Sequence, residues 1–346
     1  MHVRTRRSAR ICVLLMVAAA GCGGSGGERS SAGQPKGSPP TSTTAATATT
    51  NSASLVAQST LLPWQLPAPV YRTMGSVLDG KLYVLGGLDA AGTTVAQVDM
   101  VDPAAETATG AGVLSQPTHG ATALAVGGHI LVFGGAAATS VYSQVQGFDP
   151  ATDTTQIVGQ LPGPRADVAG AIVGNDVFLL GGFDGSGPLQ SVLASPNGIS
   201  FHPAGQLALA VRYPAVAVYG GAIYLFGGLL SGAEYTGSFT TAIQRFDPAS
   251  GTSEIVANLP APLAHAMATE LDGQILIIGG STSSAPSAAI YRFDPATDAL
   301  SVVGSLPEPV TDGVAVTLGQ SAYVLGGISS GPLASVIAVT LAPRSR

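Results

Sequence analysis

Polar side chains that could bind a ligand or move a proton recur at one position of a six-fold sequence pattern. The fixed points of this pattern are six Gly-Gly doublets, which begin at residues 86, 134, 181, 227, 279 and 326. The residues 14 positions before the doublets are Arg72, Gly120, Asp167, Tyr213, His265 and Asp312, and the two positions before these add His119, Arg212 and Arg165. Arg, His and Tyr together can bind a polar or anionic small molecule through bidentate and hydroxyl hydrogen bonds.

The elements that must position these residues are indicated by the doublets themselves. Each doublet follows four mostly apolar residues, as in LYVLGG and ILVFGG, which is typical of a strand buried on both faces. A Leu lies 20 residues before every doublet, and a turn pair, mostly Asp-Pro, lies 12 residues before five of these Leu residues. The doublets are 46 to 52 residues apart, a period that indicates propeller blades or solenoid units.

Each repeat has room for four strands, which we place in the first repeat at 74–78, 82–85, 95–101 and 107–113. Pairs such as Asp79-Gly80 favour tight hairpins between the first two strands. Because successive strands are antiparallel, the loop after each doublet lies on the same face as the entrance to the first strand. The length variation between repeats falls in these loops, and variable loops on a rigid scaffold commonly carry binding sites.

Small residues such as Gly75 and Ala123 fit the innermost strands of a radial array. With the doublets, the Asp-Pro turns, Leu-Pro pairs such as Leu161-Pro162 and aromatic residues such as Tyr83, the pattern resembles the kelch family of β-propellers over about residues 54–342. The resemblance implies an all-β, six-bladed kelch-type β-propeller with four antiparallel strands in each blade. The Trp that this family usually places six residues after the turn Asp is missing, so we expect looser outer packing.

The last doublet is followed by a single predicted strand, near 335–339. Residues 55–65 stand where a fourth strand stands before every other Leu-Pro. We therefore expect an N-terminal strand to close the last blade, which removes sheet edges that could pair with other chains.

In a six-bladed ring, the polar positions converge on one mouth of the central channel. We predict a binding or scaffold protein that recognises a glycan, a sugar acid, a peptide or an envelope protein on this face, where the Arg side chains give the mouth a positive potential. The predicted ligand-binding residues are Arg72, His119, Arg165, Arg212, Tyr213 and His265.

Two other interpretations of the same residues stay open. Similarity to kelch-type N-acetylneuraminate epimerases implies a carbohydrate-active enzyme, in which Asp167, His265 or Asp312 transfers protons. Whether the protein is an enzyme is left uncertain, and a non-catalytic role is favoured. Alternatively, the polar residues only solvate the channel mouth and tie the inner strands to neighbouring blades.

The longest loop after a doublet, 229–241, contains Glu234, Tyr235 and Phe239. Exposed aromatic side chains on a long loop are typical of recognition surfaces. The loop could instead fold back over the fourth blade as packing, and the sequence leaves both possibilities open.

Residues 1–21 are predicted to be a lipoprotein-type signal peptide, because four Arg residues precede a run of ten apolar residues that is too short to span a bilayer. The sequence Ala20-Gly21-Cys22 resembles a bacterial lipobox, which implies a lipid on Cys22 and anchoring to the outer face of the cell membrane. The alternative is an ordinary signal peptidase site. Residues 22–53 are predicted to form a disordered Gly/Ser/Thr/Pro tether, and residues 343–346 a C-terminal tail.

Composition argues against several classes of partner. Residues 54–342 contain 6 basic and 19 acidic residues, too few clustered cations for nucleic acid. The four His residues of the propeller have no metal-ligand spacing, and we predict neither a metal nor a cofactor. The propeller has no Cys, so the copper site of galactose oxidase, with its thioether-linked Cys and Tyr, cannot form. We expect a monomer that contacts the membrane only through its N-terminal lipid.

Overall fold

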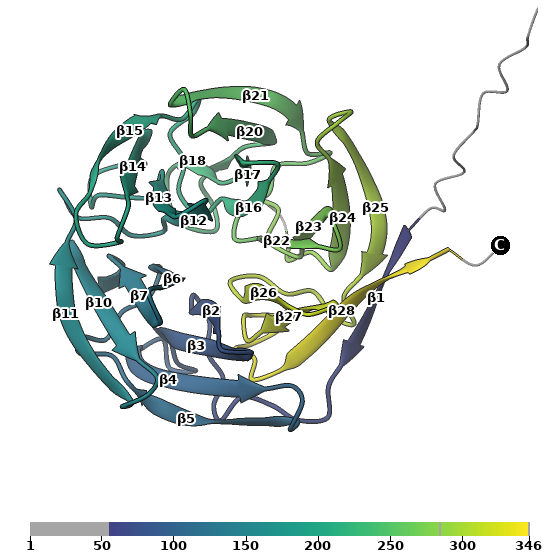
Figure 1. The fold of residues 1–346 in the computed structure, drawn as a ribbon. Helices are drawn as coiled ribbons and strands as arrows, with labels where there is room; N and C mark the ends of the chain where they lie inside the picture. The colour runs from purple at the N-terminus through teal and green to yellow at the C-terminus, as the bar shows by residue number, and fades with distance from the viewer. Residues whose placement is uncertain (1–54, 284, 345–346) are drawn as a thin grey trace, which may run out of the picture. The chain divides into compact units, whose positions relative to one another are not determined.

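The computed structural model describes residues 55–283 and 285–344. Within these ranges the chain contains β-strands and no helix, and it forms six four-stranded antiparallel sheets arranged as a six-bladed β-propeller (Figure 1). The predicted fold class is confirmed. The predicted signal peptide, the lipidation site at Cys22 and the tether lie outside the described residues. Nowhere in the described part of the chain is there a helix with the length and apolar character needed to cross a membrane.

The blades follow one another along the chain, with the innermost strand first. Blade one consists of β2 (Met74–Leu78), β3 (Lys81–Leu88), β4 (Thr94–Asp102) and β5 (Thr107–Val113). Blade two consists of β6 (Thr122–Val126), β7 (His129–Phe133), β10 (Gln144–Asp149) and β11 (Thr154–Gln160). Blade three consists of β12 (Ala169–Val173), β13 (Asp176–Leu180), β14 (Ser191–Ser195) and β15 (His202–Gln206).

The second half of the propeller repeats this order. Blade four consists of β16 (Ala215–Tyr219), β17 (Ala222–Phe226), β20 (Ala242–Asp247) and β21 (Thr252–Asn258). Blade five consists of β22 (Met267–Leu271), β23 (Gln274–Ile278), β24 (Ala289–Asp294) and β25 (Ala299–Ser305). Blade six consists of β26 (Val314–Leu318), β27 (Ser321–Leu325), β28 (Val336–Pro343) and β1 (Leu55–Leu61). Two short hairpins follow doublets: β8 (Ala136–Ala137) with β9 (Ser140–Val141), and β18 (Leu229–Ser231) with β19 (Ser238–Phe239).

Blade six is built from both ends of the propeller sequence, as predicted. Strand β1 pairs antiparallel with β28, from Leu55 opposite Pro343 to Leu61 opposite Ile337. In Figure 1 the purple β1 lies beside the yellow β28. Because β1 is the outermost strand of this sheet, the ring is closed by backbone hydrogen bonds between distant parts of the chain.

The glycine doublets join each blade to the next. In all six doublets the N–H of the second glycine donates to a main-chain carbonyl of the following blade at 2.8 Å, as in Gly135 to Arg165. The first glycine has a positive φ, and a Cβ there would lie 2.0 to 2.5 Å from the same carbonyl oxygen, for example 2.1 Å at Gly134. Only glycine permits this close approach, which explains why the doublet occurs in every repeat.

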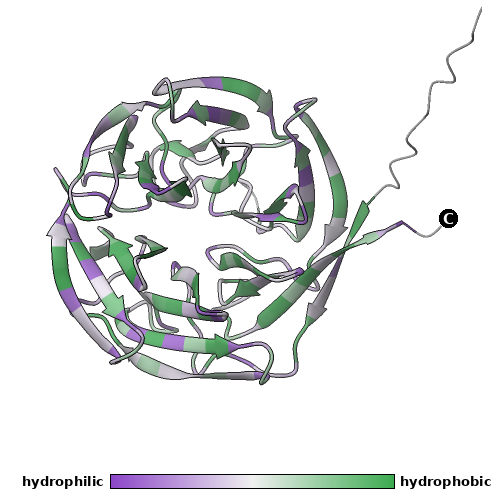
Figure 2. Ribbon diagram, in the orientation of Figure 1, coloured by the Kyte–Doolittle hydropathy of each residue, from purple (hydrophilic) through white to green (hydrophobic). Residues whose placement is uncertain are grey.

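Hydrophobic side chains fill the spaces between neighbouring blades, and Figure 2 shows hydrophobic stretches in the strands of all six blades. An aromatic residue of a second strand contacts a Phe of the next blade at three interfaces: Tyr83 with Phe148, Phe178 with Phe246, and Tyr224 with Phe293. In blades one to five the third strand has a β-bulge against the fourth, which increases the twist of the blade.

Candidate functional site

The six residues 14 positions before the doublets form a closed ring of backbone hydrogen bonds around the channel. Each residue has a φ between 50° and 61°. Each N–H donates to the carbonyl of its counterpart in the preceding blade at 2.5 to 3.2 Å, including Arg72 of blade one to Asp312 of blade six. Four of the six are Gly, Asp or His, types that tolerate a left-handed backbone comparatively well. The ring fixes where every inner strand begins and brings the six positions together, as the sequence pattern predicts.

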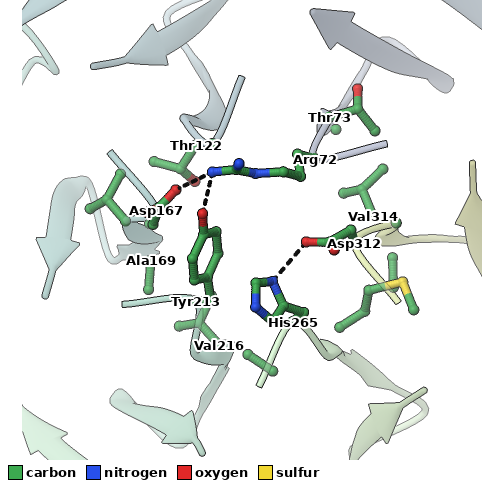
Figure 3. Close-up of a pocket in the computed structure, with 18 of the residues that line it drawn as sticks. Arg72, Thr73, Thr122, Asp167, Ala169, Tyr213, Val216, His265, Asp312 and Val314 are labelled. Carbon is green, nitrogen blue, oxygen red and sulfur yellow. Dashed lines mark hydrogen bonds and ion pairs between the residues drawn. The ribbon is translucent and has the colours of Figure 1, made fainter. Parts of the chain in front are cut away.

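The side chains of this ring lie at one end of a cavity of about 310 Å³. The cavity wall is lined by small residues of the inner strands, such as Gly75 and Ala215, and by larger aliphatic ones. Figure 3 shows Ala169, Val216 and Val314 among the lining residues. The polar groups are therefore concentrated at the mouth, and the wall beyond them is mainly aliphatic.

Arg72 is the centre of the first polar cluster. Its Nη2 donates to Asp167 Oδ1 at 2.9 Å and to the hydroxyl of Tyr213 (Figure 3). Its Nη1 donates to Glu234 Oε1 at 2.9 Å. The side chain is only 8% exposed, and its Nε has no hydrogen-bond partner among the described residues. Burial lowers the pKa of Arg72, but Tyr213, Asp167 and Glu234 outweigh this effect, so the pKa is raised and the guanidinium stays charged.

The contact between Arg72 and Asp167 depends on a glycine between them. Arg72 belongs to blade one and Asp167 to blade three, so the pair spans the position of Gly120 in blade two. A Cβ at Gly120 would lie 2.6 Å from Asp167 Oδ1 and 3.3 Å from Arg72 Nη2. The missing side chain thus makes room for the ion pair.

Asp167 lies between two arginines. Its second oxygen, Oδ2, is 3.6 Å from Arg212 Nη1. The guanidinium of Arg212 lies over the ring of Phe183, 4.5 Å from its centroid, and faces the ring of Tyr213 at 5.2 Å. Burial raises the pKa of Asp167, and the charges of Arg72 and Arg212 oppose that rise.

His265 and Asp312 form the second polar cluster. His265 Nδ1 lies 2.8 Å from Asp312 Oδ1, and its Nε2 lies 3.0 Å from the main-chain oxygen of Glu234. Carboxylate and carbonyl oxygens only accept hydrogen bonds, so both ring nitrogens must donate and the imidazole is protonated. Burial opposes the charge, but Asp312 outweighs it and raises the pKa of His265. In turn His265, together with the 2.5 Å hydrogen bond from Tyr235, overcomes burial and lowers the pKa of Asp312.

Aromatic rings enclose His265 from two sides. The ring of Tyr213 lies 4.1 Å from the imidazole, centroid to centroid, and the ring of Tyr235 stacks on it at 4.9 Å. Every polar atom of the His265 and Asp312 side chains is hydrogen-bonded within the protein. These two residues therefore act here as a packed ion pair.

The tip of the predicted recognition loop contacts four residues of the backbone ring: Arg72, Tyr213, His265 and Asp312. Glu234 and Tyr235 lie in the turn between β18 and β19, and both contact the ring. The expectation that Phe239 is exposed is wrong. It lies in β19 opposite Leu229 and is 8% exposed, packed with Leu229 and Ala264. The base of the hairpin is thus apolar packing, whereas its tip makes polar contacts with the channel mouth.

The structure does not bring Arg165 and His119 into these clusters. Arg165 Nη1 donates to the main-chain oxygens of Gly181 at 2.8 Å and Ser191 at 3.0 Å, and Nη2 donates to Ser191 Oγ at 2.6 Å. Burial lowers the pKa of Arg165 to about 10, and the contacts of its guanidinium lie within blade three, so it supports that blade rather than tying it to a neighbour. His119 Nδ1 lies 2.9 Å from Thr94 Oγ1, and burial together with the charge of Arg72 lowers its pKa to about 4, so it is neutral at pH 7.

The charges of Arg72 and Arg212 are balanced by carboxylates within the protein, whereas Arg165 is buried against main-chain oxygens and a serine hydroxyl, so the expected positive potential at the mouth is reduced. Arg165 and Arg212 are 5% and 7% exposed, and Arg72 faces two carboxylates. Sequence reasoning missed Glu234 as a partner of Arg72. The unusual length of its loop was the one available signal, and loop length does not reveal which way the tip turns.

Within the described ranges, no three His, Cys, Asp or Glu side chains lie close enough together to hold a metal ion.

Comparisons with known proteins extend the description of the fold. No protein-family model and no curated protein matches the chain. The solved structure of YjhT is similar, with a TM-score of 0.67 and 18% sequence identity, over 81% of this chain and 95% of that one. At this level of identity the likeness concerns the fold of the propeller.

Proposed function

We propose that this protein is a non-catalytic binding protein that recognises a carboxylate-bearing ligand, such as a sugar acid or an acidic glycan, at the channel mouth. One observation carries the proposal: a carboxylate is already held there. Glu234 Oε1 accepts hydrogen bonds from Arg72 Nη1 at 2.9 Å and from the Tyr213 hydroxyl at 3.0 Å. The Asp-Pro turns and Leu-Pro pairs support a kelch-type repeat as the scaffold.

The enzyme alternative has weaker support. Proton transfer needs an acid or base that can reach the substrate. His265 and Asp312 are hydrogen-bonded to each other independently of the loop, and while the hairpin tip is bound their remaining polar atoms are bonded to Glu234 and Tyr235. Asp167 is 3% exposed in its side chain and paired with two arginines. A binding role requires no such free acid or base.

A thermal-shift comparison of glucuronate with glucose tests the binding proposal, since the two sugars differ in the carboxylate. We expect glucuronate to raise the melting temperature and glucose to leave it unchanged. A ligand present at a hundred times its Kd stabilises the folded state by about 2.7 kcal/mol. Tyr213→Phe removes one donor to the carboxylate and should weaken binding about tenfold.

Arg245→Ala is the matched control, because Arg245 lies on β20, where it pairs with Glu254 at 3.6 Å, and its side chain is 37% exposed. It should bind glucuronate as the wild type does. If glucuronate, galacturonate and N-acetylneuraminate all fail to shift the wild type, the sugar-acid proposal is wrong and a peptide or envelope partner gains support.

We also propose that the propeller is exported and anchored by a lipid on Cys22, which rests on the sequence of residues 1–22. Cys22→Ser should then release the protein into the medium or leave its signal peptide uncleaved, which fractionation and the mass of the mature chain would reveal. Unchanged retention in the membrane fraction, with normal processing, would refute the lipid anchor.

A further inference from the structure

We propose that the tip of the β18–β19 hairpin is an internal ligand: the Glu234 carboxylate occupies the carboxylate site of the channel mouth and leaves when an external carboxylate binds. The identity of the external ligand rests on the proposed function. The inference itself concerns residues of this chain and the donors that they share.

Glu234 differs from the other carboxylate on Arg72. The Asp167 side chain is 3% exposed and also faces Arg212, so it is a fixed counter-ion. The Glu234 side chain is 36% exposed and reaches the site from a loop. An exposed carboxylate at the end of a flexible side chain can be exchanged for a dissolved one, whereas a buried and doubly paired carboxylate cannot.

The hairpin is anchored at its base by apolar packing, and its tip is held by polar contacts and by the stacking of Tyr235 on His265. At the base, Leu229 and Phe239 pair across the strands and pack on Ala264. At the tip, the Glu234 carboxylate binds Arg72 and Tyr213, its main-chain oxygen faces His265 Nε2, and Tyr235 donates to Asp312. The tip can therefore lift away while the apolar base stays in place.

The tip also has its own internal structure. The N–H of Gly237 donates to the main-chain oxygen of Ala233 at 2.8 Å, which closes a turn around Glu234 and Tyr235. Gly232 has a φ of 85°, a conformation that glycine adopts without strain. The turn is thus a compact unit, closed where Gly232 and Gly237 pack against each other: a Cβ at Gly232 would lie 2.9 Å from Gly237 Cα.

A bound tip reduces the apparent affinity for an external ligand. The apparent Kd equals the intrinsic Kd divided by the fraction of molecules whose site is free. Removing the Glu234 carboxylate should raise that fraction and leave Arg72 with an unfilled anion site. The variant should then bind carboxylates more tightly than the wild type, opposite to the usual result of removing a polar residue from a binding site.

Glu234→Ala is the test, with acetate and glucuronate as probes and calorimetry and melting temperature as readouts. We expect the variant to bind glucuronate at least about tenfold more tightly than the wild type. We also expect acetate, which fits the space left by the Glu side chain, to stabilise the variant. Glu254→Ala removes the same charge from an exposed position of blade four, 66% exposed in its side chain, and should bind as the wild type does. Glu234→Gln keeps the shape of the side chain and serves if Glu234→Ala does not fold.

The outcomes separate this inference from the proposed function. A variant with no carboxylate-dependent stabilisation refutes the internal ligand, whatever the wild type binds. Equal affinities of wild type and variant refute it as well but leave the proposed function standing. If the variant gains carboxylate binding and the wild type shows none, the internal ligand is supported and the proposed function of the wild type is not. Adding Tyr213→Phe to Glu234→Ala should remove most of the gain, because the external carboxylate uses the same donor.

Discussion

Deletion of residues 55–61, the whole of β1, is expected to convert the protein into oligomers and aggregates. Without β1, the strand β28 becomes the edge of blade six and exposes a full row of unpaired backbone groups, because all seven residues of β1 are paired with it. Unpaired edges of this length join to other chains. Size-exclusion chromatography with light scattering would show most of the protein above monomer mass, and the melting temperature of the remaining monomer would be lower.

A deletion of seven residues at 42–48, within the predicted tether, is the matched control. It shortens the chain before the propeller by the same amount and retains β1, so its behaviour should match that of the full chain. If the β1 deletion stays monomeric with an unchanged melting temperature, closure by β1 contributes little to the stability of the ring.

The fold could be predicted because its determinants are local and repeated six times. A Cβ on the first glycine of each doublet would lie 2.0 to 2.5 Å from a carbonyl oxygen of the next blade, so only glycine fits there. The doublets therefore mark the position of every blade in the sequence. The strands predicted at 74–78 and 107–113 match β2 and β5. The strand predicted at 82–85 is shorter than β3, which continues through its doublet to Leu88 because Gly87 pairs with Val95. That extension depends on the partner strand and is not visible in the doublet itself.

The candidate site could be predicted only in part. Counting from the doublets brings Arg72, Asp167, Tyr213, His265 and Asp312 to one place, because the backbone ring holds equivalent residues of all blades together. Which of these side chains pair with each other depends on the length of each side chain and on which position between them has no side chain. Arg72 pairs across blade two because Gly120 has no side chain.

Two further features of the site were beyond the sequence pattern. Arg165 lies two positions from Asp167 in the chain, yet its guanidinium binds main-chain oxygens of blade three and stays away from the channel cavity. Glu234 comes from a loop without a counterpart of equal length, so no count from a doublet could place it. Repetition predicts backbone positions well, and it says much less about side chains whose partners belong to an insertion.

Replacing Arg72 with Met is expected to lower the free energy of unfolding by about 3 to 5 kcal/mol, the cost of removing one partner from a buried ion pair. The substitution leaves Asp167 buried, with Arg212 as its remaining cation at 3.6 Å. It also leaves Glu234 and the Tyr213 hydroxyl without their shared donor. Urea denaturation followed by fluorescence would measure the loss.

Two comparisons show whether this cost arises from the buried charges. Arg245→Met breaks an exposed pair with Glu254 and should cost less than about 1 kcal/mol. Asp167→Asn removes the carboxylate that has lost its nearer arginine, and Asn tolerates the positive φ of 53° at this position. In the double variant with Arg72→Met it should recover part of the lost stability, since the buried carboxylate that only the more distant Arg212 balances is then absent. If Arg72→Met costs no more than Arg245→Met, or if Asp167→Asn adds its full cost to that of Arg72→Met, the two side chains do not stabilise each other.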